Sequence, residues 1–257
     1  MSAETAFELG LPGARAVFST RRGGVSDAPY ESMNLGILTD DDPERVMENR
    51  RRVARAAGVA PERVGMGWQV HGTDLLEWDA PPGTGRSYAD PRGKLLPQVD
   101  GHLTAEPDLA LLVLVADCYP VALSDGARTA MLHCGWRPLA GGILERAIER
   151  FDGTPEAAVG PGIGGCCYEV GPEVLAEFED VPGAADGRML DLRAVISRKL
   201  VTAGVSRVQH IDHCTSCRPD LYFSHRRDGG VTGRQAGLVV LMSSNWKTPS
   251  GATGFGL

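Results

Sequence analysis

Short hydrophobic runs bounded by turn-forming residues divide the middle of the chain into segments of strand length. One run covers Leu111 to Val115, a second follows Cys118, and a third ends at His133. Ser124-Asp125-Gly126 separates the last two runs and is typical of a turn, so a strand, a turn and a returning strand are expected. Cys118 and His133 would then lie at the same edge of a sheet, where α/β proteins place reactive groups.

The remaining elements follow from the same patterns. A helix is expected to begin at Asp42-Pro43 and to end at Gly58, because Asp and Pro favour helix starts and Gly favours helix ends. Further helices are expected at 139–151, from Pro172 onwards, and between Asp191 and Gly204. Further strands are expected at 14–20, 64–70, 157–160, 207–211 and 238–242.

These elements do not alternate as the strand–helix–strand units of a doubly wound fold do. An α+β fold is therefore expected, with layered mixed β-sheets flanked by helices. Residues 1–257 contain no internal repeat and no clear linker, which predicts a single domain. The Gly- and Pro-rich segment 81–97 is interpreted as a long loop, and the tail after Trp246 is expected to fray.

The charge, the hydrophobic runs and the cysteine content of the chain argue against several classes of function. The net charge of −7 argues against general nucleic-acid binding, which needs a basic face. No hydrophobic run approaches the length that spans a membrane, and the first residues lack the basic and apolar regions of a secretion signal. Six cysteines in a chain without such a signal indicate reduced thiols, and the cytoplasm is the expected location.

Candidate metal ligands occur where apolar runs end. His71 follows the expected strand at 64–70, and together with Cys118 and His133 it supplies two imidazoles and one thiolate. Three protein ligands with a fourth position left open are typical of catalytic zinc, so this set could hold one zinc ion per chain, although its dispersed spacing is not by itself diagnostic of a metal site. The alternative for Cys118 and His133 is a buried cysteine and a core histidine.

A second candidate metal set is more compact. His210, His213, Cys214 and Cys217 form H-x2-H-C-x2-C, a pattern that could close a structural zinc site. Against this interpretation, closed zinc sites normally combine two pairs of ligands from separate parts of the chain. The adjacent Cys166 and Cys167 are interpreted as a structural or weakly redox-active pair.

Six segments between residues 18 and 237 together resemble one known family. In order they are FSTRRGGVSDAPYESMNLG, WQVHGTD, ADCYPV, HCGWRPLAGGI, GPGIGGCCYEVG and CTSCRPDLYFSHRRDGGVTGRQAG. They resemble the YfiH/laccase-domain family, whose members are also described as multifunctional purine nucleoside phosphorylases. The resemblance implies a YfiH-like domain of layered mixed sheets with zinc held by His71, Cys118 and His133. Cys134 and Pro138 depart from the family's H-A-G-W-R-G pattern, but Cys134 should point away from His133 on an alternating strand.

The resemblance also implies the chemistry. It implies phosphorolysis of adenosine, inosine, guanosine and S-methyl-5′-thioadenosine, together with hydrolytic deamination of adenosine. Nucleoside and phosphate would be the small-molecule partners, with Arg21 and Arg227 as candidates for binding phosphate. Asn34 and Gln69 are candidates for contacts with the ribose or the base, because their side chains carry both donors and acceptors.

Two other enzyme classes remain as alternatives. A copper-dependent polyphenol oxidase of the laccase type would need more histidines than the six in this chain, which makes copper less favoured than zinc. A cysteine hydrolase would use Cys118 as the nucleophile and His133 as its base. Metal content separates the hydrolase from the phosphorylase, because a cysteine nucleophile needs no stoichiometric zinc.

Overall fold

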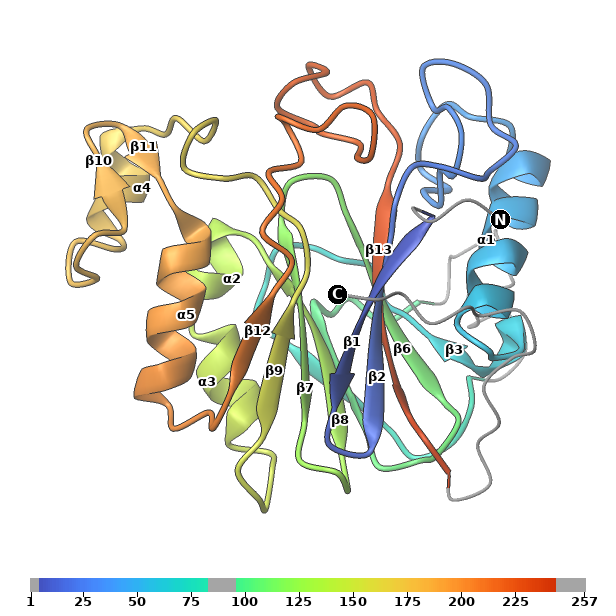
Figure 1. Cartoon of the computed structure of the whole chain (residues 1–257), viewed down its shortest axis with the longest axis horizontal. Helices are drawn as coiled ribbons and strands as arrows, with labels where there is room; N and C mark the ends of the chain where they lie inside the picture. Colours follow the sequence, from blue (N-terminus) through green and yellow to red (C-terminus); the bar gives the residue numbers. More distant parts are fainter. Residues whose placement is uncertain (1–4, 83–95, 244–257) are drawn as a thin grey trace.

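Two mixed β-sheets form the centre of the protein in a computed structural model that describes residues 5–82 and 96–243 (Figure 1). The five-stranded sheet has the order β1 (Ala6–Leu11), β2 (Ala14–Ser19), β13 (Gln235–Leu241), β6 (Ala110–Val115), β3 (Val64–Gly65). The six-stranded sheet has the order β12 (Val208–His210), β9 (Glu156–Val159), β7 (Tyr119–Ser124), β8 (Thr129–Cys134), β5 (Gly101–Thr104), β4 (Leu75–Trp78). Most neighbouring strands are antiparallel, whereas β3–β6, β4–β5 and β9–β12 are parallel pairs.

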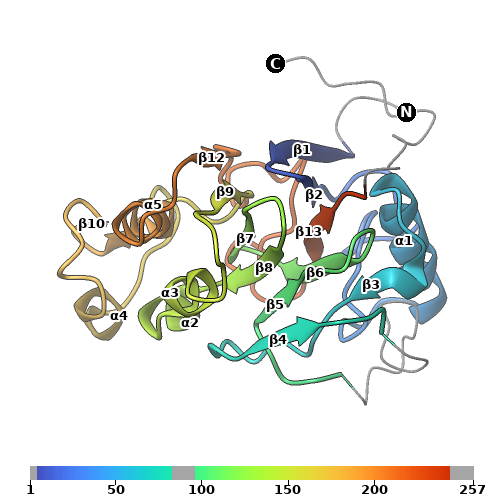
Figure 2. The same ribbon diagram turned by 90° about the horizontal axis from the view of Figure 1, so that it is seen from below.

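The sheets are stacked between helices, as Figure 2 shows. One face of the six-stranded sheet packs against α3 (Ile143–Ile148) and α5 (Leu192–Thr202), and its other face packs against the five-stranded sheet. The far face of the five-stranded sheet packs against α1 (Pro43–Ala56). α2 (Trp136–Ala140), α4 (Pro172–Ala176), the 3₁₀ helix η1 (Pro61–Arg63) and the small β10 (Ala185–Asp186)–β11 (Met189–Leu190) ribbon complete the described elements. The expected α+β architecture of layered mixed sheets is confirmed.

Local sequence signals account for the longer helices. The Asp42 side chain accepts a hydrogen bond from the backbone N–H of Glu44, Pro43 occupies the first turn, and Gly58 follows the helix with a φ of 76°. The Asp191 side chain likewise accepts from the backbone N–H groups of Arg193 and Ala194. Both helices therefore begin where their caps predict.

Two sequence-based elements were wrong in extent. Only Val64–Gly65 of the expected strand at 64–70 pairs with a neighbouring strand, because the Gln69 side chain takes the place of a backbone ladder. Its amide donates to the Leu114 carbonyl over 2.7 Å and accepts from the Leu114 N–H over 2.8 Å. The expected helix at 139–151 is divided into α2 and α3, because Gly142 has a left-handed φ of 83° between them. The loop expected at 81–97 and the tail after Trp246 fall largely or wholly outside the described residues.

Candidate functional site

His71, Cys118 and His133 converge where the two sheets meet. Their ligand atoms all lie within 4.8 Å of one another. His71 Nε2 lies 4.0 Å from Cys118 Sγ, and the two imidazole ring centroids are 4.8 Å apart. His133 is the second-last residue of β8, Cys118 lies between β6 and β7, and His71 lies in the loop between β3 and β4. The structure thus brings together the three residues that the sequence predicted as metal ligands.

Gly135 makes room for this group. A Cβ atom at this position would lie 2.9 Å from Cys118 Sγ and 3.4 Å from a ring carbon of His71. A contact below 3.0 Å would force the thiol or the backbone to shift. The neighbouring Cys134 faces the helix-covered core, as its alternation with His133 predicted.

Asp100 holds both imidazole-bearing segments. It is fully buried, and its Oδ1 lies 2.7 Å from His133 Nδ1 and accepts from the His71 N–H over 3.0 Å. Its Oδ2 accepts from the backbone N–H groups of Val70 and Gly72 over 3.0 and 2.7 Å. Because Nδ1 of His133 is committed to Asp100, Nε2 is the nitrogen left to face Cys118 and His71. A carboxylate behind a ligating histidine is the usual way of fixing the orientation and tautomer of such a ligand.

The local electrostatics favour a thiolate. Burial opposes a negative charge on Cys118, but the His133 and His71 imidazoles outweigh it and lower the pKa of Cys118 to about 6. Burial likewise opposes a positive charge on His133, but Cys118 and Asp100 outweigh it and raise the pKa of His133 to about 9. Without a metal, the thiol and imidazole therefore form a charged pair near neutral pH.

The donor set fits a zinc ion. Tetrahedral zinc with bonds of about 2.3 Å to sulfur and 2.0–2.1 Å to nitrogen places its donors about 3.3–3.6 Å apart. The observed 4.0 Å between His71 Nε2 and Cys118 Sγ requires only a small closure to reach this spacing. The group therefore has the ligand types, the number and nearly the spacing of a three-ligand zinc site.

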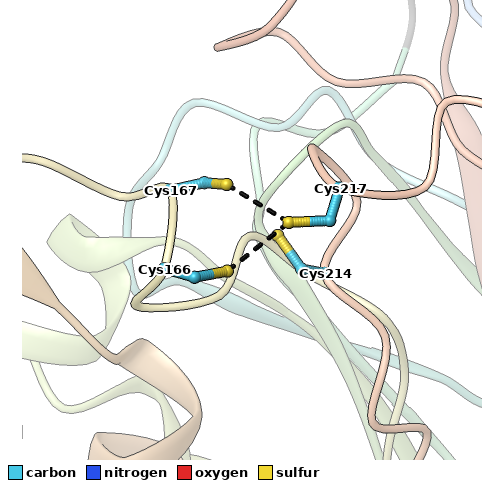
Figure 3. Close-up of side chains that lie close together, drawn as sticks. All are labelled: Cys166, Cys167, Cys214 and Cys217. Atoms are coloured by element: carbon cyan, nitrogen blue, oxygen red, sulfur yellow. Dashed lines mark hydrogen bonds between the residues drawn. The ribbon is translucent and has the colours of Figure 1, made fainter.

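The compact H-x2-H-C-x2-C set does not form as the pattern predicted. His210 Nε2 lies 3.2 Å from Ser197 Oγ, and His213 Nδ1 lies 2.9 Å from the Tyr222 hydroxyl. Cys214 and Cys217 instead lie beside Cys166 and Cys167 (Figure 3). The histidines are therefore replaced by a pair of cysteines from a separate loop.

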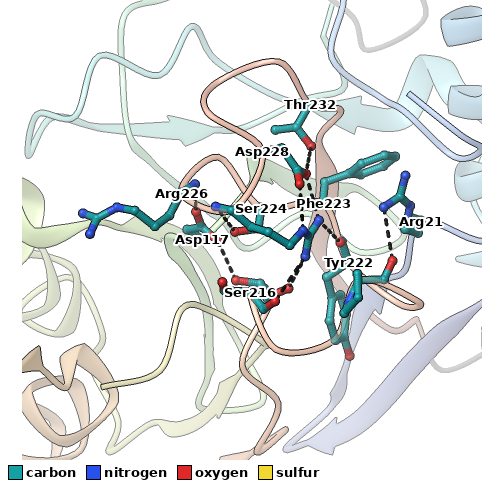
Figure 4. A network of polar contacts seen from close by, with 12 residues as sticks. Arg21, Asp117, Ser216, Tyr222, Phe223, Ser224, Arg226, Asp228 and Thr232 are labelled. Atoms are coloured by element: carbon teal, nitrogen blue, oxygen red, sulfur yellow. Dashed lines mark hydrogen bonds and ion pairs between the residues drawn. The ribbon is translucent and has the colours of Figure 1, made fainter. Parts of the chain in front are cut away.

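Asp117 connects Cys118 to the loop after β12. Its backbone has a φ of 95°, a left-handed conformation that non-glycine residues rarely adopt. Its carboxylate accepts hydrogen bonds from the Thr215 hydroxyl over 2.6 Å and from the Arg226 N–H over 2.7 Å (Figure 4). These bonds hold the strained residue and orient Cys118.

The three donors line one wall of a cavity of about 470 Å³. This volume lies within the range of about 300–1,000 Å³ that is usual for small-molecule sites. Aromatic side chains and cationic side chains line the remaining walls. They include Trp68, Trp136, Tyr168, Arg137, Arg226 and Arg234.

Of the four residues predicted to bind substrate, only Gln69 lines this cavity, and both ends of its amide are bonded to Leu114. Arg21 donates to the carbonyls of Glu31 and Pro219 and lies 4.6 Å from the centre of the Phe223 ring. Asn34 is fully buried and donates to Thr39 and Asp41. The substrate-binding roles of all four residues stay predictions.

Arg227 also lies away from the cavity wall. Its guanidinium forms an ion pair with Asp228 at 2.7 Å and donates to the carbonyls of Thr215 and Tyr222. Through these bonds Arg227 stabilises the 215–228 loop.

The family model described as multi-copper polyphenol oxidoreductase laccase matches residues 15–242. The chain belongs to this family. It is 37% identical over 243 residues to the purine nucleoside phosphorylase YfiH of Escherichia coli K12, covering 90% of this chain and 95% of that protein. It is 40% identical over 243 residues to the purine nucleoside phosphorylase SCO2081 of Streptomyces coelicolor, covering 89% of this chain and 96% of that protein. The crystal structure of YlmD from Geobacillus stearothermophilus superposes with a TM-score of 0.85 at 32% identity, covering 95% and 98% of the two chains.

Few histidines of this chain are placed to bind the copper that the family's description names. All six histidines fall within the described residues, and only His71 and His133 belong to a group of convergent metal-type donors there. His102 is buried and accepts from the Trp78 indole over 3.2 Å, and burial lowers its pKa to about 4. The contact with Trp78 and the burial give His102 a structural role.

In residues 5–82 and 96–243, no helix combines the length and the apolar character needed to cross a membrane.

Proposed function

We propose that this chain is a zinc-dependent purine nucleoside phosphorylase. Its substrates would be adenosine, inosine, guanosine and S-methyl-5′-thioadenosine, and deamination of adenosine would be a second reaction. The observation that carries the proposal is the convergence of His71, Cys118 and His133 on a cavity lined by arginines and aromatic rings. The similarity to relatives named purine nucleoside phosphorylases supports the phosphorylase reaction.

His71, Cys118 and His133 would hold the zinc ion. Zinc bound by these three ligands would supply a Lewis acid to the cavity that they line. The protein's own contribution is orientation, because Asp100 keeps the His133 proton on Nδ1 and so leaves Nε2 free for the metal. A cytoplasmic location, in which Cys118 stays reduced, is part of this proposal.

The aromatic side chains suit a purine. Trp68 and Tyr168 present flat apolar surfaces to the cavity, and stacking on such rings is the usual way of holding a base without regard to its substituents. This would explain how adenosine, inosine and guanosine can share one site. The Arg226 guanidinium carbon lies 5.1 Å from the centre of the Tyr168 ring and supports that ring from the side of the 215–228 loop.

Arg137 is the best-placed residue for phosphate. Its guanidinium carbon lies 4.4 Å from the centre of the Trp136 ring, and within the described residues its nitrogens make no hydrogen bond or ion pair. Its donor fork thus remains available for the oxygens of a phosphate. Arg234 lines the same cavity, but its Nη1 already donates to the carbonyls of Thr232 and Gly233.

Phosphorolysis requires phosphate and the nucleoside to be held next to each other. A phosphate oxygen forms a bond to C1′ of the ribose as the bond from C1′ to the purine nitrogen breaks, and the purine leaves with the electron pair and takes up a proton. Holding phosphate at Arg137 and the purine on the aromatic side chains of the same cavity would bring the two reactants together at C1′. Deamination uses water in place of phosphate and releases ammonia from the purine.

Product analysis tests the proposal. Adenosine without phosphate should give inosine alone, whereas adding phosphate should also give free purine base and ribose 1-phosphate. Cys118→Ala should lose both reactions, because an open zinc site does not tolerate the loss of one of three ligands. Free base formed at the same rate without phosphate would show a nucleoside hydrolase and refute phosphorolysis. Copper as the bound metal, with oxygen-dependent oxidation of phenols, would favour the oxidase.

The Asp100–His133 hydrogen bond favours one second candidate, a cysteine hydrolase. A buried carboxylate that orients a histidine beside a thiolate is also the arrangement of a Cys-His-Asp triad. His71 separates the two readings, because a triad does not need it. His71→Ala should abolish a metal-dependent reaction but spare a cysteine hydrolase.

A further inference from the structure

Four of the six cysteines gather in one place that the proposed active site does not use. The Sγ atoms of Cys166, Cys167, Cys214 and Cys217 all lie within 4.8 Å of one another. Cys217 Sγ is 3.6 Å from Cys166 Sγ and 3.4 Å from Cys167 Sγ, and Figure 3 shows both side chains directed at it. We propose that these four thiolates form a second, structural zinc site.

The spacing suits a single tetrahedral ion. Four sulfurs bound to zinc at about 2.3 Å lie about 3.8 Å from one another. The observed distances of 3.4 and 3.6 Å lie close to this value and far above the 2.03–2.05 Å typical of a disulfide. A redox switch needs two thiols, whereas four convergent thiols match the ligand number of a closed zinc site.

The fold explains why the two pairs meet. β9 and β12 are adjacent parallel strands with Val159 opposite His210, so the loops that follow them leave the sheet at the same end. The loop after β9 carries Cys166 and Cys167, and the loop after β12 carries Cys214 and Cys217. A bridge between Gly162 and Cys214 continues the parallel pairing into these loops. The site thus draws two ligand pairs from separate parts of the chain, as closed zinc sites normally do.

The backbone around the sulfurs is arranged for a thiolate. The Gly164 N–H donates to Cys214 Sγ over 3.2 Å. A backbone N–H donor from a turn that carries ligands stabilises a negatively charged sulfur. Gly164 also packs against the cluster, since a Cβ there would lie 3.3 Å from both Cys166 Sγ and Cys214 Cβ.

A zinc ion here would join the two loops that carry the cysteines and so stabilise the wall of the cavity. The first loop carries Tyr168, which lines the cavity, and the second carries Thr215, which holds the Asp117 carboxylate. Binding would replace four thiol protons by one ion and leave no open coordination position. The site would therefore fix the cavity wall without taking part in the chemistry.

Zinc stoichiometry of the reduced, full-length protein tests this inference. Wild-type protein should carry two zinc ions per chain instead of the single ion that the sequence predicts. Cys217→Ser should lose one equivalent, since Cys217 contacts both Cys166 and Cys167, while His210→Ala should retain both and so exclude the histidine-containing set. Equal zinc content in wild type and Cys217→Ser would overturn the proposal. Cys118→Ala should lose the other equivalent, so failure of one site is distinguishable from failure of the other.

Two measurements cover a Cys217→Ser protein that does not fold. Cobalt added to metal-depleted Cys118→Ala protein should give the intense sulfur-to-cobalt charge-transfer absorption of a tetrahedral four-thiolate site, and its absence would overturn the proposal. Thiol titration of denatured, chelated wild-type protein should find all six cysteines reduced. Two fewer free thiols, with zinc content at one or below, would assign the cluster to a disulfide. Iron at this site would overturn the choice of zinc.

Discussion

Asp100→Asn is the sharpest test of how the candidate active site is held together. The substitution keeps the shape of the side chain and replaces one oxygen by an NH₂ group, which only donates. Both oxygens of Asp100 face hydrogen-bond donors: Oδ2 accepts from Val70 and Gly72, and Oδ1 accepts from His71 and lies against His133 Nδ1. The amide nitrogen of asparagine therefore faces donors in either orientation.

The cost follows from counting the donors left without an acceptor. With the nitrogen in place of Oδ2, two partly buried backbone N–H groups lose their partner at up to about 1–3 kcal/mol each, so roughly 2–6 kcal/mol is the upper bound. With the nitrogen in place of Oδ1, the His71 N–H loses its partner and His133 must accept at Nδ1. Its proton then moves to Nε2, the nitrogen that should bind zinc, and loss of such a supporting contact typically weakens metal binding 10- to 100-fold.

Two assays measure these alternatives together. Denaturant unfolding of the metal-free protein gives the loss of stability, and competition with a chelator gives the loss of zinc affinity. The matched control is Asp125→Asn, because Asp125 also accepts from three backbone N–H groups, those of Ala127, Arg128 and Gly153, but does so in a partly exposed turn where asparagine is well tolerated. An Asp100→Asn protein with unchanged unfolding free energy and unchanged zinc affinity would refute this account of Asp100.

Three further outcomes are expected. Gly135→Ala should lower stability by about 1–3 kcal/mol and reduce zinc content, because its Cβ would lie 2.9 Å from Cys118 Sγ; a thermal melt with metal analysis checks this. Arg137→Ala should raise the KM for phosphate roughly 10- to 100-fold by removing charge-assisted hydrogen bonds, with Arg21→Ala, the variant of the sequence-based candidate, as the control. Chelation should abolish phosphorolysis and deamination together, and added zinc should restore both; full activity of the metal-free protein would make the metal purely structural.

The convergence of Cys118 and His133 could be predicted because the local sequence shows where buried strands end. Cys118 and His133 interrupt continuous apolar runs, and a polar group at such a point must either face a site or find a partner. The same logic indicated the strands β6, β7 and β8 that position them. It failed for the expected strand at 64–70, since nothing in the local pattern shows that the Gln69 amide would bond to β6 in place of the backbone.

Other parts of the site depend on contacts that a linear pattern does not show. Asp100 is an acidic residue before a glycine in the sequence, and its role comes from a loop about thirty positions away that delivers three consecutive N–H groups to it. The sequence also does not show which arginines have guanidinium groups free of other partners. Arg21 and Arg227 lie in motif-rich loops, but their guanidinium groups bond to nearby carbonyls and to Asp228, whereas Arg137 makes no such bond among the described residues.

The conformation of His71 favours a metal over a cysteine hydrolase. Its backbone has a φ of 59°, and a non-glycine residue in the left-handed region costs about 1–2 kcal/mol. The three backbone hydrogen bonds to Asp100 offset this cost and hold the His71 ring against Cys118. A Cys-His-Asp triad is complete with Cys118, His133 and Asp100 and gains nothing from a second imidazole held in a strained conformation. A metal site, in contrast, needs the third donor that His71 provides, and Asp100 holds both histidines for it through the His71 backbone N–H and the His133 ring.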